Sequence, residues 1–161
     1  MISRLARVSI VLTAGVLMVA VMGTAQSKDR FVGTWRLNIT KSKYSPGPPP
    51  KSQVATYETA GQGYKVSVKI ESATGSAQEW SYTSNLDGKD TPITGNNPNA
   101  DTNAVKRIDA HTLESVMKKG GKVTTTQRNV VSADGKTRTV TTTGMDGQGQ
   151  NVNNVAVFEK Q

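Results

Sequence analysis

Few residues in this chain could carry out catalysis. The 161-residue sequence contains one histidine, His111, and no cysteine. As a general base, His111 would need a nucleophile and an orienting carboxylate within reach. Asp109 could be that carboxylate only if a regular strand places it on the same face as His111. Otherwise His111 is simply an exposed histidine at a strand edge. Because no side chains have metal-ligand spacing, we expect neither an enzyme, nor a metal site, nor another cofactor.

Two arginines could instead bind an anion. Arg107 and Arg128 both lie in stretches that favour strands. An arginine that points into a protein without a counter-charge is costly, so an inward side chain would mark an anion-binding pocket. An outward side chain would be an ordinary surface arginine. The sequence leaves both orientations open.

Alternating apolar residues predict strands that could line such a pocket. The stretches 64–71 (YKVSVKIE) and 78–84 (QEWSYTS) both alternate with a period of two, which is typical of a half-buried strand. The side chains that would share the inner face are Tyr64, Val66, Val68, Ile70, Trp80 and Tyr82. Aromatic side chains supply large contact areas in binding pockets. The alternative is that they simply fill the core.

The second half of the chain also consists of strand patterns. Residues 122–133, 136–144 and 154–160 are rich in β-branched side chains, which favour strands. In residues 111–119 the alternation breaks near Ser115, which predicts a β-bulge there.

Glycine-containing dipeptides predict the turns between these strands. Gly120-Gly121, Asp134-Gly135 and Asp87-Gly88 are typical of two-residue hairpin loops, which require positive φ angles. Residues 61–63 predict another short turn. Two longer polar loops are expected at residues 94–101 and 145–154.

These strands predict one all-β domain. Eight to ten short strands joined by tight turns favour an antiparallel sandwich or barrel. No disulfide can join two sheets, because the chain has no cysteine, and a closed barrel has no exposed edges. We therefore expect a single antiparallel up-and-down barrel of 8–10 strands.

The first 25 residues predict a secretory signal peptide. Arg4 and Arg7 precede an apolar run over residues 8–22, and Gly23 and Ala25 occupy the −3 and −1 positions of a cleavage site. The alternative is an N-terminal membrane anchor, for which the run is short. We expect residues 26–161 to be a periplasmic or extracellular domain without a lipid anchor.

The charge balance is positive. Loss of the two leader arginines lowers the net charge from +8 to about +6. The lysines and arginines are spread over all strands instead of clustering with aromatic residues, which argues against nucleic acid. They favour attraction to an anionic component of the cell envelope, or simply solubility. We expect a monomer that does not insert stably into membranes.

A proline-rich arm spans residues 40–51. It contains Pro46, Pro48, Pro49 and Pro50. Proline fixes φ and lacks the N–H that a helix needs. We therefore expect an extended arm that crosses either the barrel surface or the barrel mouth.

The ends of the chain resemble known barrel proteins. Residues 31–37 (FVGTWRL) resemble the first strand of the intracellular fatty-acid-binding proteins, and Gly33-x-Trp35 resembles the lipocalin signature. Residues 155–160 (VAVFEK) resemble the closing strand of the fatty-acid-binding group, and residues 121–128 (GKVTTTQR) resemble a late strand that supplies a cavity arginine.

This resemblance implies a calycin-type barrel around a cavity for a small apolar ligand. Trp35, after Gly33, would plug the closed end of the barrel, and Lys160 would pack across its ring. Arg128 matches a position that binds a ligand carboxylate in the fatty-acid-binding group.

The chain departs from that group in two places. Residues 40–51 are too short and too rich in proline for the helical lid. The Arg-x-Tyr of the closing strand is replaced by Ala156 and Phe158. The chain therefore resembles a bacterial secreted lipocalin-like domain more than a member of the intracellular group.

Two functions follow as alternatives. The first is a secreted, non-enzymatic binding protein for a small apolar or amphiphilic ligand, with Tyr64, Val66, Val68, Trp80, Tyr82, Arg107 and Arg128 as candidate ligand contacts. The second is an envelope interaction module with a filled barrel, which binds a protein or an anionic polymer through the proline-rich arm or the basic surface.

Overall fold

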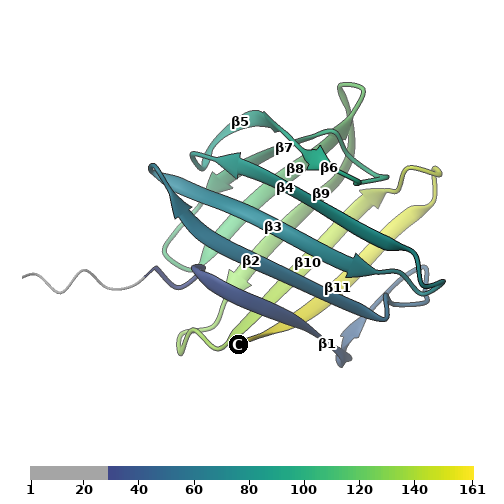
Figure 1. The fold of residues 1–161 in the computed structure, drawn as a ribbon, viewed down its shortest axis with the longest axis horizontal. Coiled ribbons are helices and arrows are strands. Elements are labelled where there is room, and N and C mark those ends of the chain that lie inside the picture. Colours follow the sequence, from purple (N-terminus) through teal and green to yellow (C-terminus); the bar gives the residue numbers. More distant parts are fainter. Residues whose placement is uncertain (1–28) are drawn as a thin grey trace, which may run out of the picture.

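The computed structural model describes residues 29–161 (Figure 1). The expected signal peptide, residues 1–25, lies outside the described residues. Among residues 29–161, no helix is long and apolar enough to cross a membrane.

Residues 29–161 form one antiparallel sheet of eleven strands. The strands are β1 (Gly33–Lys43), β2 (Ser52–Ala60), β3 (Gly63–Glu71), β4 (Ala77–Ser84), β5 (Asp87–Pro92), β6 (Thr94–Gly95), β7 (Thr102–Arg107), β8 (Thr112–Lys119), β9 (Lys122–Val131), β10 (Thr137–Met145) and β11 (Asn151–Lys160). Their order in the sheet is β5-β7-β8-β9-β10-β11-β1-β2-β3-β4-β6. The all-β, up-and-down prediction is confirmed, and the strand count exceeds the expected range because the two-residue β6 adds one strand.

The sheet curls into a nearly closed barrel. β1 pairs with both β2 and β11, which joins the first and last strands of the described chain. On the other side, β5 pairs with β7, and β6 returns to pair with β4 through Trp80↔Gly95 and Ser81↔Thr94. Figure 1 shows β1 to β4 crossing in front of β7 to β11, so the two groups of strands form opposite walls.

The alternation in β3 and β4 orients their side chains as predicted. Val66 and Val68 are buried on the inner side of β3, and they pair with Tyr82 and Trp80 of β4. Lys65, the neighbour of Val66 in β3, is exposed on the other face of the strand. The apolar period of two therefore defines the inner face of this wall.

The predicted bulge at Ser115 is wrong. β8 pairs with β7 in continuous register from Leu113 (opposite Arg107) to Lys118 (opposite Thr102). Its register against β9 shifts at Met117/Lys118, not at Ser115. Ser115 is buried, and its hydroxyl lies 3.5 Å from Oε1 of Gln127 on β9. The apolar pattern breaks because a polar residue occupies an inward position of a regular strand.

The turn predictions are partly correct. Gly120 and Gly121 form the two-residue loop between β8 and β9, with φ angles of 57° and 76°. Asp87-Gly88 is not a turn but the start of β5, because the chain reverses at residues 85–86, where Leu86 has a φ of 63°. The loop around Asp134-Gly135 contains five residues, 132–136, instead of two.

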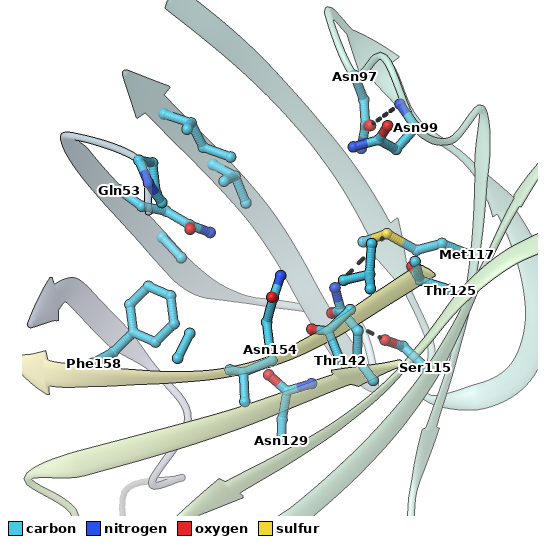
Figure 2. Close-up of a pocket in the computed structure, with 18 of the residues that line it drawn as sticks. Gln53, Asn97, Asn99, Ser115, Met117, Thr125, Asn129, Thr142, Asn154 and Phe158 are labelled. Atoms are coloured by element: carbon cyan, nitrogen blue, oxygen red, sulfur yellow. Dashed lines mark hydrogen bonds between the residues drawn. The ribbon is translucent and has the colours of Figure 1, made fainter. Parts of the chain in front are cut away.

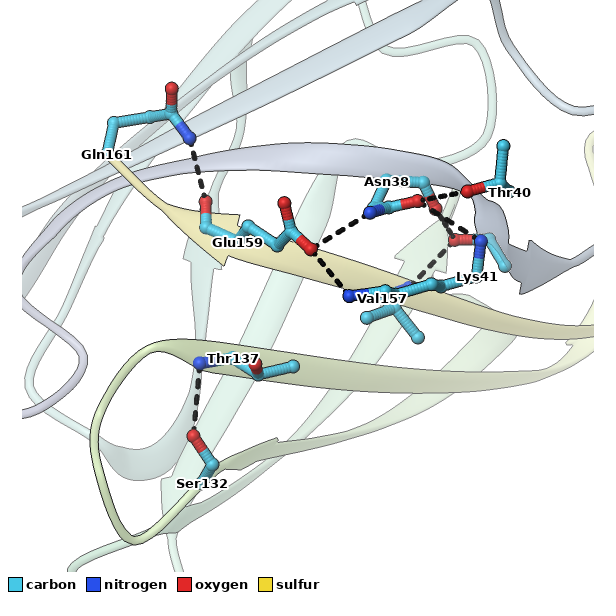
Figure 3. Close-up of polar contacts among 9 residues, drawn as sticks. Asn38, Thr40, Lys41, Ser132, Thr137, Val157, Glu159 and Gln161 are labelled. Carbon is cyan, nitrogen blue, oxygen red and sulfur yellow. Dashed lines mark hydrogen bonds and ion pairs between the residues drawn. The ribbon is translucent and has the colours of Figure 1, made fainter.

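Polar contacts hold an irregular part of β1 against β11 (Figure 3). The pairing register shifts between Asn38 and Lys43. There, Oε1 of Glu159 accepts hydrogen bonds from Nζ of Lys41 (2.8 Å) and Nδ2 of Asn38 (2.9 Å). The hydroxyl of Ser42 accepts from the N–H of Val157 at 2.9 Å. Side chains thus replace the backbone hydrogen bonds that the register shift removes.

These contacts predict an acid-dependent part of the stability. The hydrogen bond from Lys41, followed by that from Asn38, lowers the pKa of Glu159 below its ordinary 4.5. A lowered folded-state pKa stabilises the protein above the unfolded-state pKa, and this stabilisation is lost as the pH falls through the folded-state pKa. We expect Glu159→Gln to lower the melting temperature slightly at pH 7 and to lose this effect in acid, as the pH falls through the lowered folded-state pKa of Glu159. Melting curves of both proteins across this range test the prediction, and a difference that persists unchanged in acid would contradict it.

Candidate ligand-binding cavity

The barrel contains a cavity of about 350 Å³. Side chains from β2, β3, β4, β7, β8, β9, β10 and β11 line it, together with the proline-rich arm. This volume lies within the range of small-molecule sites. The inward side chains therefore do not fill the interior completely.

One wall of the cavity is apolar and aromatic. It is formed by side chains of β3 and β4, namely Val66, Val68, Ile70, Trp80 and Tyr82. The rings of Trp80 and Tyr82 stack, with centroids 6.0 Å apart and an angle of 19° between the ring planes. Burial raises the pKa of Tyr82 well above its ordinary value, so its hydroxyl stays neutral at physiological pH.

The opposite wall contains most of the polar side chains. β9 lies roughly halfway around the sheet order from β3, and it contributes Thr125, Gln127 and Asn129 to the cavity lining. Ser115 of β8 and Thr142 of β10 extend this wall. Figure 2 shows the labelled side chains of this wall pointing into the cavity. Leu113, Met117 and Val140 lie on the same side. A ligand would thus meet amides and hydroxyls among apolar side chains on one side, and mainly rings and methyl groups on the other.

A buried arginine, Arg138, also lines the cavity. Only 3% of the surface of this residue is exposed. Nη1 donates hydrogen bonds to the hydroxyl of Tyr57 (2.8 Å) and to Oδ1 of Asn129 (3.0 Å). The guanidinium lies over the rings of Phe158 (4.3 Å), Tyr57 (5.0 Å) and Trp35 (5.6 Å). This arrangement places a fixed positive charge inside the barrel.

The proline-rich arm crosses the mouth of the barrel. Tyr44, Pro46, Pro48 and Pro50 all line the cavity. Hydrogen bonds from Ser45 N to Oδ1 of Asn154 (2.9 Å) and from the N–H of residue 153 to the Ser45 carbonyl (2.7 Å) fix the arm to β11. Burial raises the pKa of Tyr44 to about 12. The sequence left open whether the arm crosses the barrel surface or the barrel mouth, and in the structure it crosses the mouth.

Trp35 lies at the opposite end and is completely buried. Its Nε1 donates to the carbonyl of Phe31 at 2.8 Å, and Nζ of Lys160 lies 4.9 Å from the centre of its ring. Gly33 has a φ of 132°, and a Cβ at this position would lie 2.8 Å from Cε of Lys160. A glycine here therefore leaves room for the lysine that crosses the tryptophan.

Two of the predicted ligand contacts, Tyr64 and Arg107, lie outside the cavity lining. Nη2 of Arg107 forms an ion pair with Asp29 at 2.7 Å, and its guanidinium lies 5.4 Å from the ring of Tyr64. The Tyr64 hydroxyl donates to the same carboxylate. Burial, reinforced by this hydrogen bond, raises the pKa of Tyr64. Arg107 thus has a counter-charge from the segment before β1, and the cluster belongs to the closed end.

The prediction that Arg128 contributes to the cavity also needs correction. Its Nη1 lies 2.5 Å from Oε1 of Glu114, its cross-strand neighbour on β8, and both side chains are about half exposed. Arg128 is therefore a surface residue with an ordinary cross-strand partner.

Sequence reasoning missed Arg138, for which the sequence holds only a weak signal. In the stretch 136–144 (KTRTVTTTG), Arg138 shares its alternation face with Val140. Val140 is buried and lines the same cavity. Arg107 alternates with Val105 and Arg128 with Val130 in the same way, so the pattern by itself does not separate Arg138 from those two arginines.

Within residues 29–161, no three His, Cys, Asp or Glu side chains come close enough together to hold a metal ion. His111 lies in the turn before β8, where its N–H donates to Asp109 Oδ1 at 2.7 Å and its Nδ1 lies 3.1 Å from the carbonyl of Val131. It does not line the cavity.

The fold and the site define a small antiparallel β-barrel with an internal cavity. No family model matches the chain, and no curated protein matches it. A similar solved structure is that of the zebrafish ileal bile acid-binding protein complexed with cholic acid, at 14% identity and a TM-score of 0.47, covering 82% of this chain and 99% of that chain. A similarity this distant transfers no ligand and no residue role to this chain.

Proposed function

We propose that this protein is a secreted, non-enzymatic binding protein that takes a small amphiphilic ligand into its barrel. The observation that carries the proposal is the cavity of about 350 Å³, which has an apolar-aromatic wall and reaches the mouth of the barrel. Sites of this kind, mostly apolar with a few fixed polar groups, are typical of small-molecule binding. The signal-peptide pattern of residues 1–25 supports a periplasmic or extracellular location.

A second candidate is an interaction module that uses the proline-rich arm. Pro46 and Pro48 are exposed as well as lining the mouth. Proline segments lose little conformational entropy on docking. In this case the cavity would stay empty, and a partner protein would cover the arm.

Native mass spectrometry of the mature protein, purified from the compartment to which its source exports it, tests the proposal. We expect a reproducible additional mass of a few hundred daltons, which an added apolar ligand displaces and which solvent extraction releases for identification. A bare mass, combined with no uptake of the uncharged dye N-phenyl-1-naphthylamine, would overturn the binding function in favour of the interaction module.

A variant in the aromatic wall should weaken binding. Trp80→Ala removes a ring from the wall that would contact the apolar part of the ligand, and we expect the affinity for N-phenyl-1-naphthylamine to fall about tenfold, since aromatic contacts contribute about 1 kcal/mol or more. A fluorescence titration measures this change. Val123→Ala, at an exposed position outside the cavity lining, is the control and should bind as the wild type does. Equal affinity in all three proteins would place the dye elsewhere.

A further inference from the structure

We propose that Arg138 binds an acidic group of the ligand at the deep end of the cavity, so that the ligand is an organic acid with an apolar body. The inference rests on the proposed binding function. It names the chemical class of the ligand and the residue that selects it.

The first support is the missing counter-charge. No carboxylate of residues 29–161 forms an ion pair with Arg138, whereas Arg107 and Arg128 each have one. Burying a charge without a partner is costly. Aromatic rings and two neutral oxygens stabilise the guanidinium in part, but its net charge of one remains. An anion that enters the cavity would neutralise it where water screens little.

The second support is unused hydrogen-bonding capacity. A guanidinium has five N–H groups. The two bonds from Nη1 go to Tyr57 and Asn129, while the buried Nε has no partner among the described residues. Arg138 therefore retains unused N–H donors at a position that lines the cavity. Arginine donors bind the oxygens of carboxylates, sulfonates and phosphates especially well.

The third support is the way the cavity is divided along its length. Arg138 contacts Trp35 at the closed end, whereas the prolines line the mouth and the β3–β4 wall is apolar. An organic acid can satisfy all three regions at once, with its acidic group at Arg138, its body against Trp80 and Tyr82, and its far end beneath the prolines. A neutral apolar ligand would leave the charge unpaired.

The competing role of Arg138 is purely structural, because its guanidinium also packs against the rings of three buried side chains. A structural arginine would affect stability and would weaken the binding of charged and neutral ligands alike. The test must therefore compare two ligands that differ only in charge.

Two dyes provide this comparison. 8-Anilino-1-naphthalenesulfonate and N-phenyl-1-naphthylamine share one skeleton and differ by a sulfonate. We expect the wild type to bind the sulfonate at least about tenfold more tightly, since hydrogen bonds between charged groups are stronger than those between neutral ones. Arg138→Gln should abolish this preference and change the affinity for the neutral dye by no more than about threefold. Fluorescence titration measures all affinities.

The matched control is Arg128→Gln. It removes the same charge from the neighbouring strand, but on the outer surface, and it should leave both affinities unchanged. If Arg128→Gln weakens sulfonate binding as strongly as Arg138→Gln does, general electrostatic attraction explains the preference and the proposal is wrong.

A wild-type experiment covers the case in which Arg138→Gln does not fold. Laurate and dodecanol, which differ mainly in the acidic group, are compared as competitors of the neutral dye, and laurate should compete at least about tenfold better. Equal competition by both would overturn the assignment of Arg138 while leaving the binding function intact. If the wild type binds neither dye, the proposed function itself fails.

Discussion

Replacing Trp35 with alanine should lower the free energy of unfolding by about 3–5 kcal/mol, the range for a buried large aromatic side chain cut to alanine. Trp35 is completely buried and takes part in a hydrogen bond to Phe31 and in cation–π contacts with Arg138 and Lys160. All of these contacts would be lost, and the completely buried site would be left with a void. Urea denaturation of the wild type and the variant measures the loss.

Trp80→Ala is the matched control for this prediction. It makes the same chemical change in the wall of an existing cavity, where the ring has fewer packed neighbours on one side. We expect a smaller loss of stability than for Trp35→Ala. Equal losses at the two positions, or an unchanged midpoint for Trp35→Ala, would mean that Trp35 does not plug the barrel.

Gly63→Ala should destabilise the protein by about 2–3 kcal/mol, the upper part of the range for forcing an additional methyl group into a packed site. A Cβ at position 63 would lie 1.9 Å from the carbonyl oxygen of Ser84 and 2.9 Å from Cα of Asn85. Both are backbone atoms, so relief requires the start of β3 to move away from the end of β4. Thermal or urea unfolding measures the effect.

Gly47→Ala serves as the control for Gly63→Ala. Position 47 lies in the proline-rich arm, and the nearest atom to an added Cβ is the Tyr44 carbonyl oxygen at 3.9 Å. We expect a change within about 0.5 kcal/mol, as for other surface substitutions. If Gly63→Ala also stays within this limit, the β3–β4 junction is more deformable than its geometry indicates.

The sequence predicts the parts of this fold that depend on local pattern. Alternation placed Val66, Val68, Trp80 and Tyr82 on one face because side-chain direction in a strand has a period of two. The Gly120-Gly121 loop was predictable because two consecutive positive φ angles demand such residues. The positive φ of Leu86 could not be predicted, because leucine does not favour that conformation.

The places of the two predicted arginines depended on partners that are distant in sequence. Arg107 is neutralised by Asp29, which is 78 residues away, and Arg128 by Glu114 on the adjacent strand. Neither pairing can be read from the arginine's own neighbours. Arg138 alternates with Val140, but Arg107 and Arg128 alternate with valines too. The burial of Arg138 and its lack of a counter-charge are properties of the assembled barrel.

The pairing of β1 with β11 has a consequence for when the cavity can form during folding. β1 (Gly33–Lys43) completes one edge only when β11 (Asn151–Lys160) lies beside it. While the chain is being made, the early strands have an open edge and no opposite wall, since β9, β10 and Arg138 come later. The cavity therefore forms only when strands from both halves of the described chain have come together, so it depends on long-range pairing and on no single hairpin.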